Sequence, residues 1–340
     1  MARSRPRHLL VLRTSAMGDV AMLPHALRAL REACPDLRIT VATRKLFFPF
    51  FAGLDVGFLE VDTKGPQHSL AGMWRLAREA RRLGVDAVAD VHGVMRSAAF
   101  GLSMRLHGVR VASIRKGRAE KRRFIRRGAA VSEPLRHTVL RYCDVFRRLG
   151  FAFGDPGPVV RAAVPAESPV GRKEGVWIGF APFSAHPGKT YPDDLSREAV
   201  RLLAGRCDRL FIHGGGGAEG EFAAQMERMW PNVTALRGKV TLSGEMEVIA
   251  REDCLVSMDS LAMHLAALVA TPVVSVWGAT HPGLGFLGWG CDPQHVLQAG
   301  LACRPCSVFG ARACRYGDYR CLRAVAPQMI AEEVDKVLKD

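Results

Sequence analysis

The stretch CLVSMDSLAMHLAALVATPVVSVW, residues 254–277, contains a complete strand, helix and strand. Residues 254–258 and 272–277 are short apolar, partly β-branched runs, and the residues between them repeat at helical spacing. Two strands joined by a helix lie parallel in one sheet, because the helix returns the chain to the edge at which the first strand began. This unit therefore predicts an α/β fold.

The same alternation extends in both directions. We predict strands at residues 8–12, 38–43, 58–62, 86–91 and 109–114, and a second series at 176–181, 209–213, 232–236, 254–258 and 272–277. A stretch rich in proline and glycine, residues 154–175, separates the two series. We expect an N-terminal Rossmann-like domain at 1–160, a second at 172–326 and a terminal helix at 327–340. Ligands of such sheets bind at the carboxyl ends of the strands, which places the site in a cleft between two facing domains.

Composition limits the class of protein further. Hydrophobic residues make up 48% and charged residues 24% of the 340 residues, as expected for globular domains with large cores. No run approaches the ~20 apolar residues that span a bilayer, and the apolar run after the N-terminus is too short for a signal peptide, so we expect a cytoplasmic protein. The net charge of +15 favours an anionic partner, although the preference for arginine over lysine also fits a bias in genome composition.

The first predicted strand runs directly into RTSAMGDV, residues 13–20, at the start of a helical pattern. Gly18 permits close approach of the backbone, and Asp19 at a helix start lies where a negative charge is favoured. A carboxylate there can accept a proton from an attacking hydroxyl. The alternative is that Asp19 only caps the helix.

The corresponding loop of the second domain is PFSAHPGKTYP, residues 182–192. Ser184 can donate a hydrogen bond to a phosphate and Lys189 can neutralise its charge. A solvated surface lysine is the alternative interpretation.

A glycine-rich loop, HGGGGAEG at residues 213–220, lies between a predicted strand and a helix. It contains the dinucleotide-binding pattern G-x-G-x-x-G, but the next strand ends in Arg237, Gly238 and Lys239 and lacks the required acidic residue. Nicotinamide binding is therefore disfavoured. The glycines either let the backbone approach a nucleotide or form a tight turn.

The opening unit carries Asp259 and Ser260 at the point where its strand meets its helix. These side chains can satisfy free helix amides, and the amides themselves form an anion site. His264 lies one turn later and can face the same ligand. A histidine packed in the core is the alternative.

Taken together, residues 13–20, 184–189, 213–219 and 257–280 resemble the lipopolysaccharide heptosyltransferases of glycosyltransferase family nine. The resemblance implies a GT-B fold and an inverting transfer of heptose from ADP-heptose to the lipopolysaccharide inner core, with no metal and no cofactor. It implies that Asp19 is the general base and that Lys189 neutralises the departing diphosphate. The implied donor-binding residues are Gly18, Ser184, Gly215, Gly216, Glu219, Asp259, Ser260, Leu261 and His264. Leu261 departs from the family, which often has glycine there, so a different donor sugar remains an alternative.

A run of basic residues, RKGRAEKRRFIRR at 115–127, follows a predicted strand of the first domain. Such runs usually form a solvated face. In an enzyme of this family, Arg115, Lys116, Arg118 and Lys121 would bind the phosphates and acidic sugar of the acceptor. The partners implied are a nucleotide sugar and a lipopolysaccharide core acceptor at the inner membrane surface, where we expect a monomer peripheral to the cytoplasmic face.

Four of the nine cysteines, Cys303, Cys306, Cys314 and Cys321, cluster near the C-terminus. A disulfide framework is not expected in the cytoplasm. A four-thiolate zinc site and a cluster of reduced, loop-packing thiols are both compatible with the spacing, of which only the first pair is typical of zinc sites. We expect no metal.

Two rival functions fit parts of the sequence. A transferase of the same fold could use another nucleotide sugar or acceptor, which release of ADP or UDP from a panel of donors would reveal. A nucleic-acid-binding module would explain the charge of +15, but aromatic residues are not interleaved with the basic run to form stacking platforms. We therefore expect no nucleic-acid partner.

Overall fold

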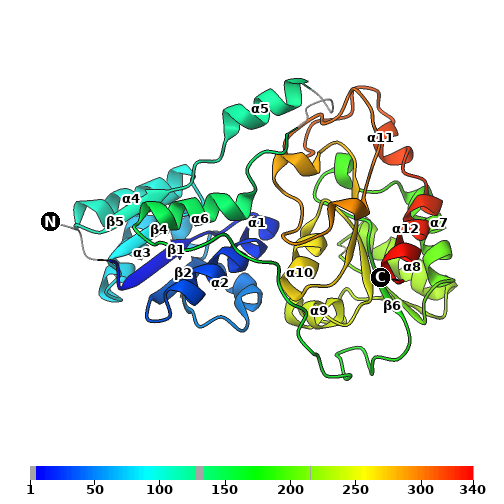
Figure 1. Cartoon of the computed structure of the whole chain (residues 1–340), viewed down its shortest axis with the longest axis horizontal. Coiled ribbons are helices and arrows are strands. Elements are labelled where there is room, and N and C mark those ends of the chain that lie inside the picture. The colour runs from blue at the N-terminus through cyan, green and yellow to red at the C-terminus, as the bar shows by residue number, and fades with distance from the viewer. Residues whose placement is uncertain (1–4, 128–132, 215, 340) are drawn as a thin grey trace. The chain divides into compact units, whose positions relative to one another are not determined.

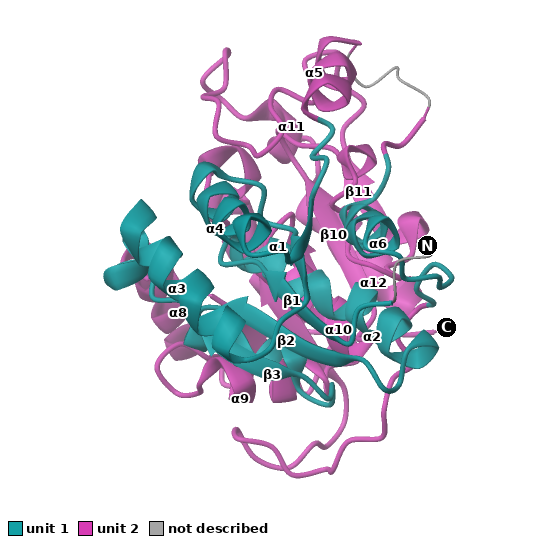
Figure 2. Ribbon diagram, turned by 90° about the vertical axis from the view of Figure 1, so that its left-hand side faces the viewer, with its two compact units in different colours: residues 1–117, 136–157 teal, residues 118–135, 158–340 magenta. Residues whose placement is uncertain are grey.

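The computed structural model describes residues 5–127, 133–214 and 216–339. The chain divides into two compact units, drawn in different colours in Figure 2. Unit 1 comprises residues 1–117 and 136–157, and unit 2 comprises residues 118–135 and 158–340. The chain thus passes from one unit to the other at three places.

Unit 1 is built on a parallel sheet of five strands in the order β3-β2-β1-β4-β5 (Figure 1). The strands are β1 (His8–Leu12), β2 (Arg38–Thr43), β3 (Gly57–Glu60), β4 (Ala87–Asp90) and β5 (Arg110–Ser113). β1 lies in the centre of the sheet and all five of its residues are buried. The order of strands reverses beside β1, which is where ligands of doubly wound sheets bind.

Helices on both sides of this sheet come from segments with one apolar stripe. They are α1 (Met17–Ala21), α2 (Leu23–Ala33), α3 (Leu70–Arg82), α4 (Met95–Leu106) and α6 (Thr138–Arg148), with 3-10 turns η1 (Lys45–Phe51) and η2 (Pro66–His68). α3 packs against α4 over a core that includes Leu10, Leu12 and Val88 of the sheet, and α2 packs against α6.

Unit 2 has a parallel sheet of six strands in the order β11-β10-β9-β6-β7-β8. The strands are β6 (Trp177–Ala181), β7 (Arg209–Ile212), β8 (Val233–Ala235), β9 (Cys254–Met258), β10 (Val273–Trp277) and β11 (Val296–Gln298). The opening unit of the sequence forms β9, α10 and β10, and its two strands pair in parallel. The strand β11 was not predicted.

The helices of unit 2 are α5 (Arg118–Arg127), α7 (Asp193–Ala204), α8 (Ala218–Met229), α9 (Leu242–Ile249), α10 (Leu261–Val269), α11 (Arg320–Arg323) and α12 (Pro327–Val337). Short 3-10 turns lie at η3 (Pro187–Lys189), η4 (Pro282–Leu284) and η5 (Pro293–His295). The terminal helix α12 packs beside α7 and on the sheet, and its buried residues Ile330 and Val334 belong to the main core of the unit.

The helix α5 lies outside unit 1, although its sequence falls within the expected N-terminal domain of residues 1–160. Its Phe124 ring packs on His281, with ring centroids 5.4 Å apart, and the N–H of Leu135 donates to the carbonyl of Gly283. The described residues of this segment, 118–127 and 133–135, therefore belong with unit 2, because the apolar contact of Phe124 and the backbone contact of Leu135 lie there.

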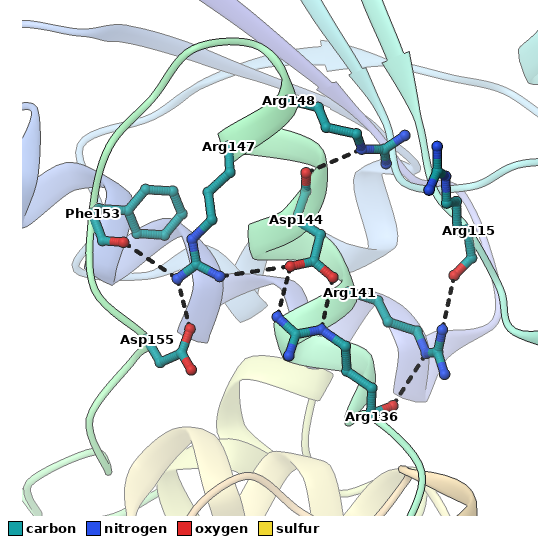
Figure 3. A network of polar contacts seen from close by, with 8 residues as sticks. All are labelled: Arg115, Arg136, Arg141, Asp144, Arg147, Arg148, Phe153 and Asp155. Atoms are coloured by element: carbon teal, nitrogen blue, oxygen red, sulfur yellow. Dashed lines mark hydrogen bonds and ion pairs between the residues drawn. The ribbon is translucent and has the colours of Figure 1, made fainter.

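Each place where the chain enters or leaves unit 1 is tied to α6 by arginine side chains (Figure 3). Arg141 donates to the carbonyl of Arg115, Arg136 forms a two-bond ion pair with Asp144, and Arg147 lies 2.6 Å from Asp155. Bidentate pairs of this kind fix orientation as well as distance.

We find no helix in the described part of the chain that is long and apolar enough to span a membrane.

Candidate active site

The carboxylate of Asp19 is held at the end of the central strand of unit 1. The strand β1 ends at Leu12, and the next residue, Arg13, is buried with its Nη2 2.5 Å from Asp19 Oδ2. Asp19 is the third residue of α1 and its Oδ2 also accepts from the N–H of Ala16. The carboxylate therefore accepts a hydrogen bond at the start of α1. At the same time, 23% of the Asp19 side chain remains exposed and accessible to a second partner.

Contacts around Arg13 fix the orientation of this pair. Arg13 Nη1 donates to the carbonyl of Val91, and the guanidinium lies 5.9 Å from the centroid of the Tyr142 ring. The hydroxyl of Tyr142 donates to the backbone carbonyl of Asp19 at 2.9 Å. Gly18 lies half-buried in the same turn, and its carbonyl accepts from the N–H of Met22.

His92 is a neighbouring residue that the sequence analysis missed. Its ring nitrogens lie 3.1 Å from the hydroxyl of Thr14 and 3.2 Å from that of Ser15, both in the loop before Asp19. Burial, together with the positive charges of Arg13 and Lys116, lowers the pKa of His92 to about 3, so the imidazole is neutral at pH 7. Its position just after the predicted strand at 86–91 was the available signal.

A small hollow in unit 1 opens beside this histidine. Its polar lining comes from the loops after β1, β3 and β4, from η2 and from the start of α4: Thr14, Thr63, Gln67, His92, Arg96 and Ser97. Its volume of about 10 Å³ is room for about one water molecule, so it does not admit a sugar.

The Lys189 ammonium of unit 2 is paired and not solvated. Its Nζ lies 3.1 Å from Asp259 Oδ2, and 15% of the lysine side chain is exposed. The same Oδ2 accepts from the hydroxyl of Thr280 at 2.8 Å. The three residues follow β6, β9 and β10, so the parallel sheet brings together at one edge groups that are distant in sequence.

Other predicted donor-binding residues surround this pair. Ser184 Oγ donates to the carbonyl of Asp259, and the hydroxyls of Ser257 and Ser260 lie 3.2 Å apart just before α10. Leu261 is half-buried as the first residue of α10, while His264 is buried one turn later. Free amides at the start of a helix add positive potential at the edge where Lys189 lies.

The glycine-rich loop follows β7, as predicted. Gly215 lies outside the described residues, while Gly216 is exposed and Glu219 lies half-buried in the first turn of α8. Gly214 and Gly217 have φ angles of 84° and 56°, the left-handed region that favours glycine. The loop therefore needs glycine for its own turn.

A buried charged cluster precedes this loop, and the sequence analysis missed two of its members. The ring of His213 lies between Glu245 at 3.0 Å and Glu252 at 2.6 Å. Burial opposes a charge on His213, but the two carboxylates outweigh it and raise its pKa to about 10. The carboxylate of Glu245 also accepts from the N–H of Gly214, which links the cluster to the glycine loop.

Three of the clustered cysteines, Cys303, Cys306 and Cys314, lie in a loop that packs beside Lys189, and Cys321 lies in α11. The N–H of Cys306 donates to the carbonyl of Ala279, whose own N–H donates to the carbonyl of Gly188. A Cβ at Gly310 would come within 2.6 Å of the Lys189 side chain, so this position requires glycine. Among the described residues, which include all four thiols, no group of three or more His, Cys, Asp or Glu is arranged to hold a metal ion.

The residues expected to bind the acceptor divide between the units. Arg115 and Lys116 lie in unit 1, and Arg118 and Lys121 lie on α5 in unit 2. Arg118 is exposed, whereas Lys121 is buried with its Nζ 3.9 Å from the centroid of the Phe286 ring. Lys121 therefore anchors α5, and a contact with an acceptor would require it to leave that ring.

Two Rossmann-like units, each with charged groups at the carboxyl ends of its central strands, place the chain in the class of two-domain proteins with the GT-B fold. The solved structures support this fold. The glycosyltransferase of family 9 from Veillonella parvula has a TM-score of 0.71 at 17% identity, over 98% of this chain and 97% of that one. The Escherichia coli heptosyltransferase WaaC, solved with ADP-2-deoxy-2-fluoro heptose, has a TM-score of 0.69 at 20% identity, over 97% and 99% of the two chains.

Sequence comparison gives the family. The model of glycosyltransferase family 9 (heptosyltransferase) matches residues 73–314. Lipopolysaccharide heptosyltransferase 1 of Escherichia coli K12 is 26% identical over 292 residues, which cover 81% of this chain and 89% of the relative. The chain belongs to glycosyltransferase family 9 and is a glycosyltransferase.

Proposed function

We propose that this enzyme transfers heptose from ADP-heptose to the inner core of lipopolysaccharide, with inversion at the anomeric carbon. The observation that carries the proposal is the Lys189, Asp259 and Thr280 group, which supports a diphosphate site at the strand ends of unit 2. Both Escherichia coli relatives named above are heptosyltransferases, and one of them was solved with ADP-2-deoxy-2-fluoro heptose.

Asp19 acts as the general base in this proposal. An acceptor hydroxyl attacks the anomeric carbon, its proton passes to the Asp19 carboxylate, and the bond from that carbon to the phosphate oxygen breaks with its electron pair on ADP. A single displacement inverts the anomeric centre. The ion pair with Arg13 supports this role, because it holds the carboxylate in one orientation.

Lys189 and the amides at the start of α10 stabilise the negative charge that develops on the leaving diphosphate. The residues that bind the donor are Ser184, Gly216, Glu219, Asp259, Ser260, Leu261 and His264, with Gly18 and Gly215. Because Lys189 and Asp259 are already paired and largely buried, the cation is oriented before the donor binds and little reorganisation accompanies the reaction.

The acceptor is the lipopolysaccharide core at the cytoplasmic face of the inner membrane, where the enzyme works as a peripheral monomer. Arg115, Lys116 and Arg118 provide positive charge for its phosphates and acidic sugar.

A second candidate is a transferase of the same fold with another donor sugar, and Leu261 favours it. A leucine side chain at the first position of α10 occupies space that glycine would leave to the donor. Incubation of the purified protein with ADP-heptose, ADP-glucose and UDP-glucose, followed by measurement of the released nucleotide, separates the two. We expect acceptor-dependent release of ADP from ADP-heptose, and release from another donor alone would establish the second candidate.

A further inference from the structure

The helix α5 concentrates positive charge on unit 2. Its sequence, RAEKRRFIRR, contains five arginines and one lysine against a single acid, Glu120. The function proposed above uses only Arg118 of these residues, so most of this charge has no assigned role.

One face of α5 is fixed to unit 2. Phe124 and Lys121 are its buried residues, one against His281 and the other over the Phe286 ring. Lys121 and Phe124 are three residues apart and so lie on one side of the helix. Their burial leaves the opposite side of α5 facing away from the unit.

That opposite side carries Arg122, Arg123 and Arg126, and Arg118 and Arg127 lie at its two margins. Arg118, Arg122 and Arg126 form one row at i, i+4 spacing, and Arg123 and Arg127 form a second row. All five are exposed, and none forms an ion pair with any residue within 5–127, 133–214 or 216–339. We call these five residues the arginine face.

The arginine face does not help the helix to fold. Like charges at i, i+4 repel one another and destabilise an isolated helix. An anionic surface would neutralise the guanidinium groups and relieve this repulsion.

Its geometry fits an extended surface. The five guanidinium groups extend over nearly three turns of the helix, and Arg122, Arg123 and Arg126 line one open hollow on it. The one aromatic ring of α5, Phe124, is buried, so the exposed face has no ring on which a base could stack. A membrane surface of phosphate groups matches an exposed helix face that carries several cations and no aromatic ring.

We propose that the arginine face of α5 docks the enzyme on a bilayer of anionic phospholipid. This proposal deepens the proposed function and rests on it in one respect, because a lipid-linked acceptor requires the enzyme to reach a membrane. Each arginine near the membrane surface adds to the electrostatic attraction between the protein and a negatively charged leaflet. This attraction weakens as the ionic strength rises.

Co-sedimentation with vesicles tests the proposal without any substrate. The full-length protein is mixed with vesicles of phosphatidylcholine alone or with 30% phosphatidylglycerol, at low and at physiological salt. We expect binding to the anionic vesicles only, weakening with salt, and at least a ~10-fold loss in the triple variant Arg122→Gln/Arg123→Gln/Arg126→Gln. Equal binding of wild type and variant to anionic vesicles would overturn the proposal.

A matched control is available on α3. Arg75, Arg78 and Arg82 are exposed on one side of that helix, so Arg75→Gln/Arg78→Gln/Arg82→Gln removes the same charge at similar spacing. We expect this variant to bind vesicles nearly as wild type does. An equal loss in both variants would show that net charge alone attracts the protein, which contradicts a docking face. Thermal unfolding of both variants checks that each is folded.

Two further measurements distinguish docking on phospholipid from binding of the acceptor's phosphates or of nucleic acid. If the arginine face bound the acceptor's own phosphates, the α5 variant would lose turnover on a lipid-free core oligosaccharide and keep its vesicle binding. If it bound nucleic acid, wild type would retain an oligonucleotide at physiological salt and release the vesicles. Either result overturns the proposal. An enzyme that binds anionic vesicles but does not use ADP-heptose would instead refute the proposed function.

Discussion

The ammonium of Lys189 lies 3.1 Å from a carboxylate oxygen of Asp259 that also accepts a hydrogen bond from Thr280. The pair therefore holds the Lys189 ammonium in one orientation at the edge of the sheet where a diphosphate would leave.

Substitution of Lys189 tests this role. We expect Lys189→Ala to lower kcat by ~10²–10³-fold, because removal of one preorganised charge at a developing anion typically costs that much. Lys189→Arg should recover part of the rate. ADP release at saturating donor measures the effect, with Lys336→Ala as a control, since Lys336 is an exposed lysine of α12 paired with Glu333. Unaltered turnover in Lys189→Ala would remove this residue from the reaction.

Substitution of Asp19 separates chemistry from binding. We expect Asp19→Asn to abolish turnover, because an amide cannot accept the proton from the attacking hydroxyl. The affinity for ADP should stay close to that of wild type. Asp55, an exposed carboxylate of the same unit that is also paired with an arginine, supplies the control variant Asp55→Asn. Full activity of Asp19→Asn would exclude it as the base.

The lowered pKa of His92 predicts that the free energy of unfolding decreases in acid. Its pKa is about 3 in the folded protein and about 6.5 when unfolded, so the unfolded chain gains a proton that the folded chain does not. His92 therefore has little effect on the free energy of unfolding above about pH 6.5. As the pH falls below that value, it lowers the free energy of unfolding, by about 2 kcal/mol at pH 5. Urea unfolding of wild type and His92→Gln between pH 5 and 7.5 measures it. A free energy difference that does not vary with pH would contradict the prediction.

His213 predicts the opposite dependence. Its pKa of about 10 lies above the unfolded value, so its stabilising contribution is complete below pH 6.5 and is lost as the pH rises toward 10. We expect His213→Gln to be destabilised at pH 7, because Glu245 and Glu252 lose their shared cation, and to approach wild type at pH 9.5. The comparison uses urea unfolding at both values. A constant difference would show that the imidazole is not charged in the folded protein.

The strands that carry the site could be predicted because apolar runs and turn residues are local signals. The short edge strand β11 could not, since its three residues are only half-buried and show no buried apolar run. The assignment of α5 to unit 2 depends on Phe124 and Lys121 meeting residues more than 150 positions away. No local pattern reveals such contacts.

The candidate site shows the same limit. Asp19, Lys189 and Asp259 were found because each follows a predicted strand. The contacts of Arg13 with Asp19 and of Thr280 with Asp259 depend on how the folded chain brings their loops together. The contact of Glu252 with the buried His213 likewise joins residues that are distant in sequence.

Mass measurement of the acceptor tests the central claim most directly. Purified enzyme is incubated with ADP-heptose and a lipopolysaccharide core that lacks heptose, with Asp19→Asn in parallel. The account predicts that wild type adds one heptose to each acceptor and releases one ADP, and that the variant adds none. An acceptor of unchanged mass with wild-type enzyme, under conditions where another nucleotide sugar is transferred, would contradict it.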